Sequence, residues 1–541
     1  MTSVLRGEIK LPGRPLIWGA ALTVCLLFVY SWLQKRSKRQ RHVPGIPILG
    51  GKENLLENRQ RFLGDSLAML REGYEQVTDI RDRYTPVLAD ESTHPQWKGS
   101  FFYVPTPLGE RLMIPGRYLE DLKSANMRHV DFQATFLEVS ELCFHRVDGY
   151  LILSKMFEGH YTTLGTHTRL LPQVVRTKLN QYLVDVMPGI QEEIRDSFDQ
   201  CFPLCDDWTE VNVVEMMALI VARVSSRMFG GSDLSQNEEW VQASLKFAHD
   251  GFTAAQKLKQ WPDLLKPIAQ YLIPEIRAIR SFYEIAERAA VPLMEDRERH
   301  GIKALDLLAW MADQAKGSEK DLKFIAGTLL KVSFAAYHTS AAAPTQLLFD
   351  LAAMPEYMEP LRAEIAETIG PDGNISAKGF AQMSKMDSIM KESQRFNPLL
   401  LITFERVVTK EYRLSDGFVI PANTWIGVPA QAIAMDATLH PEPEVFDGFR
   451  FAKTRAADTT AKPGYAASNA ASMAFGYGQH ACPGRFFAAN EIKAIMAQLL
   501  LRYDFKYPEG VSRPPSLVFE TQNLPNPAGR ILFKRRPTKI G

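Results

Sequence analysis

The chain has 541 residues, of which 46% are hydrophobic and 23% charged, ordinary values for a globular protein. Its 63 basic and 62 acidic residues leave a net charge of +1, so no basic excess favours nucleic acid as a partner. Five cysteines are too few, and odd in number, for a disulfide framework, which favours a reducing compartment.

An uncharged stretch of twenty residues, 15–34, lies near the amino terminus. As a helix it would span about 30 Å, the thickness of a hydrocarbon core. A cleaved signal peptide is the main alternative, but its apolar region is usually shorter and is not followed by a basic run such as KRSKRQR. Because that run favours the cytoplasmic side, we expect a lumenal segment at 1–14, a transmembrane anchor at 15–34, and a basic, Pro/Gly-rich hinge at 35–51.

The remainder, 52–541, is expected to be one large tethered domain without internal repeats or low-complexity linkers. Apolar residues three and four apart predict helices through most of 170–350. Alternating patterns near 101–115 and 400–430, and short apolar runs after residue 503, predict strands. The fold is therefore predicted to be mainly α with a minor β portion.

A long apolar segment, 323–352, is rich in small residues and contains Ala335-Ala336-Tyr337-His338-Thr339-Ser340. Pro344 cannot donate to the carbonyl of Ser340, which predicts a kink or a freed carbonyl one turn beyond Thr339. His338 could shuttle protons near neutrality or could simply be packed on a buried helix, and the residues alone leave both readings open.

Charged residues of opposite sign occur at Glu392 and Arg395, three residues apart and hence on one helical face. The helix carrying them must end at Asn397-Pro398. Taken alone, such a pair is commonplace on protein surfaces.

The strongest chemical signal is the segment Phe475-Gly-Tyr-Gly-Gln-His-Ala-Cys482-Pro-Gly484. Its glycines let the backbone turn tightly and approach a flat ligand. Cys482 precedes a strongly helical run, and the helix end with its amide donors is expected to lower the pKa of the thiol. Phe475 could shield the sulfur from water. By contrast, Cys201 and Cys205 lack further zinc ligands nearby and are predicted to be core thiols.

This segment resembles the haem-binding signature of the cytochrome P-450 superfamily, and the likeness extends over essentially the whole chain after the anchor. The resemblance implies the cytochrome P-450 fold and a haem b (iron protoporphyrin IX) whose iron is ligated by Cys482. It also implies that Glu392 and Arg395 form an ion cluster with Arg450, which pins the cysteine loop. The family often has Arg where this sequence has His480.

The resemblance also implies roles for the other site residues. The implied cofactor contacts, besides Cys482 as the metal ligand, are Phe475, His480, Arg406 and Arg176, the last without the Trp that often precedes it in the family. Thr339 is the implied catalytic hydroxyl, which would hydrogen-bond dioxygen and relay protons. His338 stands where the family usually has an acid.

The implied activity is NADPH- and O2-dependent oxidation of an apolar small molecule, and the His-Thr pair resembles fungal enzymes of terpenoid and other secondary-metabolite pathways. Electrons are expected from an NADPH-cytochrome reductase that docks on the cysteine side, where Arg485 and Lys493 offer positive charge. The expected location is the endoplasmic reticulum membrane, with a single pass through the lipid and a cytosolic catalytic domain. Two alternatives remain: a haem-thiolate isomerase or dehydratase, and a tethered binding protein with impaired catalysis.

Overall fold

The computed structural model describes residues 42–84, 100–126, 128–131, 158–164, 168, 170–262, 265–458 and 464–537. The predicted lumenal segment, the anchor and the first part of the hinge lie outside these ranges. Within the described ranges, no helix combines the length and the apolar character needed to cross a membrane.

Helices make up most of the described chain, as predicted. Their bounds are α2 Leu55–Tyr84, α3 Leu119–Leu122, α5 Gly159–Thr162, α6 Leu170–Val174, the π-helical turn η2 Val175–Leu179, α7 Leu183–Cys201, α8 Val213–Gly230, α9 Ser232–Ser235, α10 Glu238–Lys259, α11 Lys266–Ala269, α12 Pro274–His300, α13 Leu307–Gln314, α14 Leu322–Ala353, α15 Met358–Thr368, α16 Ala377–Gln382, α17 Ser384–Phe396, α18 Ala430–Ala434, α19 Arg450–Ala457 and α20 Arg485–Arg502, with 3-10 turns η1 Gly116–Tyr118, η3 Gly317–Lys320, η4 Pro355–Tyr357 and η5 Gly478–His480.

The strands are short and form four small sheets, the largest with the order β1-β2-β8-β5-β3. Their bounds are β1 Phe102–Thr106, β2 Gly109–Met113, β3 Val130–Asp131, β4 Thr209–Asn212, β5 Thr403–Val408, β6 Tyr412–Arg413, β7 Val419–Ile420, β8 Thr424–Val428, β9 Tyr503–Lys506, β10 Leu517–Phe519, β11 Gln522–Leu524 and β12 Arg530–Arg535. Each predicted strand region contains at least one of them, so the prediction of a minor β portion is confirmed.

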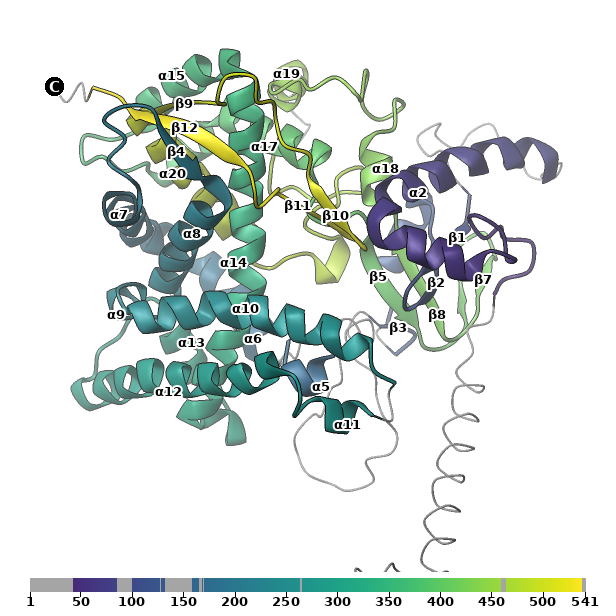
Figure 1. Ribbon diagram of the computed structural model, residues 1–541, viewed down its shortest axis with the longest axis horizontal. Helices are drawn as coiled ribbons and strands as arrows, with labels where there is room; N and C mark the ends of the chain where they lie inside the picture. The colour runs from purple at the N-terminus through teal and green to yellow at the C-terminus, as the bar shows by residue number, and fades with distance from the viewer. Residues whose placement is uncertain are drawn as a thin grey trace, which may run out of the picture.

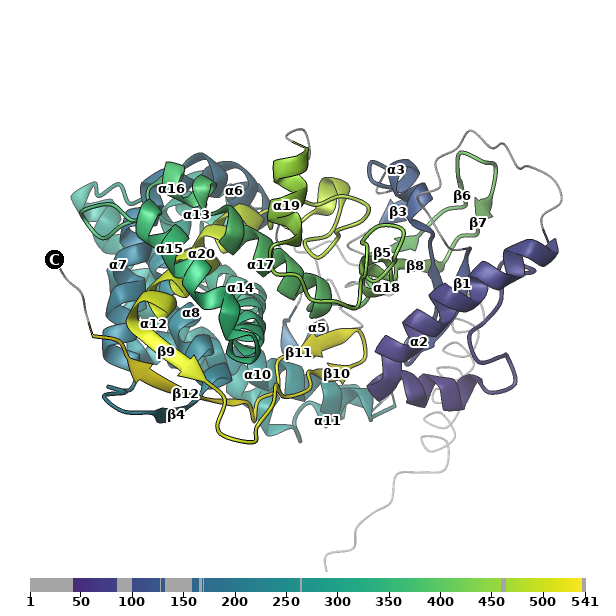
Figure 2. The same ribbon diagram turned by 90° about the horizontal axis from the view of Figure 1, so that it is seen from above.

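The helices gather in one body, and the five-stranded sheet with α2 lies beside it (Figures 1 and 2). In the sheet, β2 pairs parallel with β8, so that Leu112 lies opposite Ile426. Both side chains are buried in an apolar cluster that packs around this sheet and is smaller than the one in the helical body. The larger apolar cluster fills the helical body, through whose centre α14 runs.

Several helices begin where a short polar side chain satisfies a free backbone N–H. Asn212 accepts from the N–H of Glu215 at the start of α8, and Asp321 accepts from the N–H of Lys323 at the start of α14. From Asp321, α14 continues without interruption for 32 residues, through Pro344. The Ser340 carbonyl loses its intrahelical donor there, as predicted, but no break in the helix accompanies it.

A buried polar network fixes the rotation of α14 about its axis. The Tyr337 hydroxyl lies 2.8 Å from the Ser226 Oγ of α8, which also accepts from the Trp240 indole of α10 at 2.9 Å. All three side chains are inaccessible to solvent or nearly so. Because Tyr337 is held against α8, the residues two positions before and after it, Ala335 and Thr339, face the opposite side of the helix.

Candidate active site

The segment ending in Cys482 is a closed loop. The N–H of Cys482 donates to the carbonyl of Phe475 at 2.7 Å, and the N–H of Gly476 donates to the carbonyl of Met473 at 2.8 Å. Gly476 and Gly478 both have φ of +72°, a conformation that L side chains rarely adopt. The loop therefore delivers Cys482 to the start of α20, as the sequence predicted.

Neighbouring segments hold this loop by its backbone. The carbonyl of Gln479 accepts from the Arg176 guanidinium at 3.2 Å, and the carbonyl of Pro483 accepts from the Asn180 amide at 3.3 Å. The loop also packs closely against Lys123: a Cβ added at Gly478 would lie only 2.6 Å from the carbonyl oxygen of Lys123. Phe475, which was predicted to shield the sulfur, packs edge-on against the buried ring of Tyr465, with 5.3 Å between the ring centroids.

The expectation of a lowered thiol pKa at Cys482 was wrong. Burial raises the pKa of Cys482, and this outweighs the backbone N–H groups of Gly484 and Arg485 that hydrogen-bond the sulfur. The predicted amide donors are thus present, but desolvation in the closed loop is the larger effect.

The predicted ion cluster beneath the loop is present. Glu392 is completely buried and accepts two hydrogen bonds from Arg395, at 2.9 and 2.8 Å, and one from Arg450 at 3.2 Å. Both guanidiniums also donate to backbone carbonyls, among them that of Pro443 at 2.8 Å and that of Val445 at 2.8 Å. The cluster therefore fixes α17 against the segment that precedes α19.

A second charged group on α17 holds the chain just before the loop. Asp387 accepts from the backbone N–H of Tyr465 at 2.8 Å and pairs with Lys493 at 2.7 Å. The expectation that Lys493 offers positive charge to a reductase was wrong, because its side chain is 7% exposed and points to this carboxylate. Arg485 is half-buried, donates to the carbonyl of Cys482 and lies over the ring of Phe486.

Three residues predicted to contact the cofactor, Arg176, Arg406 and His480, come together beside the loop. Burial, followed by the positive charges of Arg406 and Arg176, lowers the pKa of His480 to about 4. Arg406 is itself buried, which lowers its pKa to about 10. Arg406 comes from β5, where Phe404 has φ of +53° and the pairing with β8 shifts register. This bulge sets the direction of the Arg406 side chain.

One face of α14 carries the predicted oxygen-side residues. Ala335, His338 and Thr339 are exposed, whereas Tyr337 between them is buried. Desolvation by the surrounding protein lowers the pKa of His338, with a smaller contribution from His249 of α10. His338 is therefore accessible to solvent but lies among protein groups that disfavour its charged form. The Thr339 hydroxyl donates to the carbonyl of Ala335 at 2.8 Å, which leaves its oxygen free to accept a hydrogen bond.

Glu491, a fully buried carboxyl group on α20, was not predicted from the sequence. It accepts from Ser225 at 3.1 Å and from the side chain of Ser340, the residue that follows Thr339. Within the described residues, its Oε2 has no hydrogen-bond partner. Burial raises the pKa of Glu491 to about 7. The only sequence signal was that Glu491 is the one acidic residue of α20.

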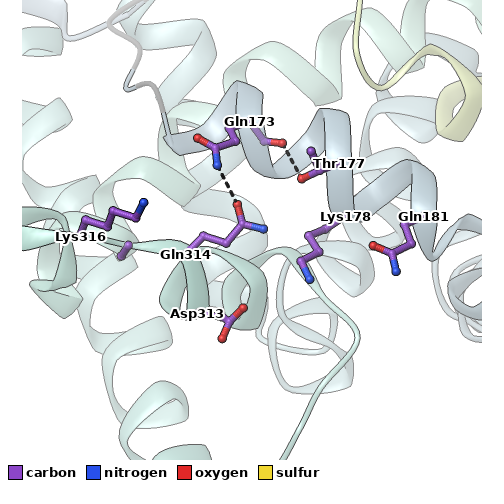
Figure 3. A pocket seen from close by; sticks show the side chains of 8 residues that line it. Gln173, Thr177, Lys178, Gln181, Asp313, Gln314 and Lys316 are labelled. Carbon is purple, nitrogen blue, oxygen red and sulfur yellow. Dashed lines mark hydrogen bonds between the residues drawn. The ribbon is translucent and has the colours of Figure 1, made fainter.

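A polar hollow of about 510 Å³ lies between η2 and α13, outside the set of predicted site residues (Figure 3). Gln173 and Gln314 point toward one another across it, and Lys178, Lys316 and Asp313 bring charges of both signs. Such a lining does not suit an apolar substrate. The α14 face remains the candidate reaction site.

Comparison with known proteins identifies the class. The sequence model of the family described as Cytochrome P450 matches residues 156–534. The chain is 35% identical over 539 residues to the cytochrome P450 monooxygenase braC of Annulohypoxylon truncatum, covering 96% of this chain and 98% of that one. It is 34% identical over 388 residues to the ent-kaurene oxidase P450-4 of Gibberella fujikuroi, covering 70% and 77%. It is 33% identical over 449 residues to the cytochrome P450 monooxygenase prx8 of Penicillium rubens, covering 81% of each.

The chain therefore belongs to the cytochrome P450 family and is a cytochrome P450 monooxygenase by class. The family implies a haem cofactor, and the residues present fit one. Cys482 supplies a soft sulfur ligand for iron. Arg176, Arg406 and His480 form a cationic and hydrogen-bonding group suited to the two propionate carboxylates of a haem.

The closed loop predicts that Gly478→Ala prevents haem binding. The new Cβ would clash with the carbonyl of Lys123, and the positive φ adds strain. Gly510→Ala is the matched control, because Gly510 has φ of +74° but open space around its Cβ position. We expect the control to lose about 1–2 kcal/mol and to keep its haem, whereas Gly478→Ala loses both haem content and thermal stability. Equal behaviour of the two variants would contradict the loop account.

The buried carboxyl of Glu491 predicts a pH-dependent stability. Its pKa in the folded protein, about 7, exceeds its ordinary value of 4.5, so its favourable contribution is lost as pH rises through 7. Glu491→Gln is therefore expected to gain about 2 kcal/mol relative to the wild type between pH 5 and pH 8. Thermal midpoints of the haem-loaded proteins measure this, with the exposed Glu367→Gln as the control. A difference that does not change with pH would contradict the assignment.

Proposed function

We propose that this chain is an NADPH- and O2-dependent monooxygenase that oxidises an apolar secondary metabolite, terpenoid, meroterpenoid or polyketide-derived. The observation that carries the proposal is the closed loop that places Cys482 beside Arg176, Arg406 and His480. The relatives support the substrate class, since one of them is named an ent-kaurene oxidase.

The residues divide into those that hold the cofactor and those that handle protons. Cys482 would ligate the iron of the haem, Arg176, Arg406 and His480 would hold its propionates, and Phe475 would shield the sulfur. When bound, the haem supplies the activation of O2.

Thr339 and His338 serve the proton side of the reaction. The Thr339 oxygen is available to accept a hydrogen bond on the open face of α14, and its hydroxyl can pass a proton onward. The lowered pKa of His338 keeps its imidazole neutral at neutral pH, so that one ring nitrogen can accept a proton while the other donates.

Electrons would come from NADPH through a membrane-bound cytochrome reductase. With Lys493 buried, the positive charge available on the cysteine side comes from the exposed Arg176 and the half-exposed Lys178 of η2. Arg176 also contacts the loop carbonyl of Gln479, so a reductase at this face would lie close to the haem.

We place the protein on the endoplasmic reticulum membrane, with a single-pass anchor at 15–34 and a cytosolic catalytic domain. The apolar, basic-flanked stretch in the sequence supports this. So do exposed apolar side chains around α11, where Ile268, Tyr271 and Leu272 are each about 65% accessible. A surface of this kind suits contact with lipid.

Cys482→Ser tests the proposed iron ligand. We expect the wild-type ferrous–CO complex to show the strongly red-shifted Soret band of thiolate ligation, and the variant to lose it. Cys201→Ser is the control, because Cys201 is a free cysteine at the end of α7 and should leave the band unchanged. A red-shifted band that persists in Cys482→Ser refutes the assignment. A product formed without NADPH, and without oxygen from O2, would instead indicate an isomerase or dehydratase.

Thr339→Ala tests the proton side independently of the haem ligand. We expect an unchanged ferrous–CO spectrum, but about tenfold less product per NADPH consumed and correspondingly more hydrogen peroxide. Thr339→Ser retains the hydroxyl and should behave like the wild type. The assay uses the reductase and a terpenoid probe that shifts the Soret band of the wild type. Equal coupling in all three proteins would remove Thr339 from the mechanism.

A further inference from the structure

The open face of α14 extends beyond the segment 335–340 toward the amino terminus of the helix. Lys331 precedes Ala335 by four residues and Thr339 by eight, so the three side chains share one face of the helix. Before this stretch Gly327 is buried, and after it Ala342 is buried. Lys331 therefore lies at the amino-terminal limit of the surface on which the substrate would meet Thr339.

Lys331 is half-buried, yet it forms no ion pair or hydrogen bond with any part of the chain that the structure describes. Two other half-buried lysines are paired with carboxylates. Lys259 pairs with Glu520 at 3.5 Å, and Lys266 pairs with Glu158 at 2.6 Å. On α14 itself, the exposed Lys323 pairs with Glu287 at 2.9 Å.

The environment of Lys331 is unfavourable for a lone ammonium group. Burial lowers its pKa, and no described carboxylate offsets that effect. Burying a charge without a partner is costly, so an anion arriving at this position would recover interaction energy that an uncharged ligand could not. The surrounding face is otherwise formed by small or uncharged side chains such as Ala335 and Thr339.

We propose that Lys331 binds the acidic group, a carboxylate, of an otherwise apolar substrate and so selects acids over their neutral counterparts. The inference rests on the proposed function and specifies the substrate class of the same site. Eight residues of helix separate Lys331 from Thr339 by about 12 Å, so the acid group lies at the far end of the substrate from the oxidised carbon.

Binding of matched acid and ester probes to the haem-loaded enzyme tests this proposal. The probes are dehydroabietic acid and its methyl ester, and dodecanoic acid and its methyl ester, titrated by their Soret shifts. We expect the wild type to bind at least one acid tightly, and Lys331→Met to weaken acid binding at least tenfold while leaving the esters unchanged. Lys331→Arg should stay within about threefold of the wild type, and the control Lys323→Met should change nothing.

The thermal midpoint without ligand gives a second readout. If Lys331 is an uncompensated cation, Lys331→Met is at least as stable as the wild type, whereas removal of a structural ion pair would lower the midpoint. The proposal is overturned if acid and ester bind alike, if neither acid binds, or if Lys331→Met is clearly destabilised. A wild type with an intact red-shifted CO band but no preference for acids would refute the Lys331 inference alone. Absence of the red-shifted CO band from the wild type would refute the proposed function itself.

Discussion

The hydrogen bond from the Cys482 N–H to the Phe475 carbonyl, 2.7 Å long, closes the loop on which the chemistry depends. The position of the loop is set by α17, because Glu392 and Asp387 of this helix hold the segments that lead into the loop. Arg176 of η2 and Asn180, which follows η2, each donate to a loop carbonyl. A π-helical turn often marks a functional site, and here it brings Arg176 to the loop without the tryptophan that the family usually places before it.

Helix α14 has a fixed side and an open side. On the fixed side, Tyr337 is hydrogen-bonded to Ser226, and Ser340 reaches the buried Glu491 of α20. These contacts hold the opposite face at a constant rotation, which is what a site that must position a substrate requires. The helix that follows Cys482 and the helix that carries Thr339 are therefore coupled through one buried carboxyl group.

Much of the site could be predicted because its signals are local. The spacing of Glu392 and Arg395, the glycines before Cys482 and the small residues around Thr339 are all short-range patterns, and each is found where it was expected. Errors arose where tertiary burial decides the outcome. Lys493 has the sequence context of a surface cation, but its side chain is turned toward Asp387. The thiol pKa of Cys482 is raised because burial outweighs the nearby backbone N–H groups. The direction of Arg406 depends on a bulge in β5, and no sequence pattern encodes it.

The central claim is that the sulfur of Cys482 is the protein's ligand to the haem iron. Iron K-edge X-ray absorption on the purified ferric enzyme tests it without relying on activity or on a substrate. The account predicts a single sulfur scatterer in the first coordination shell of the wild type, and its replacement by an oxygen or nitrogen scatterer in Cys482→Ser. A wild-type shell made only of nitrogen and oxygen, or a sulfur scatterer that persists in Cys482→Ser, would contradict it.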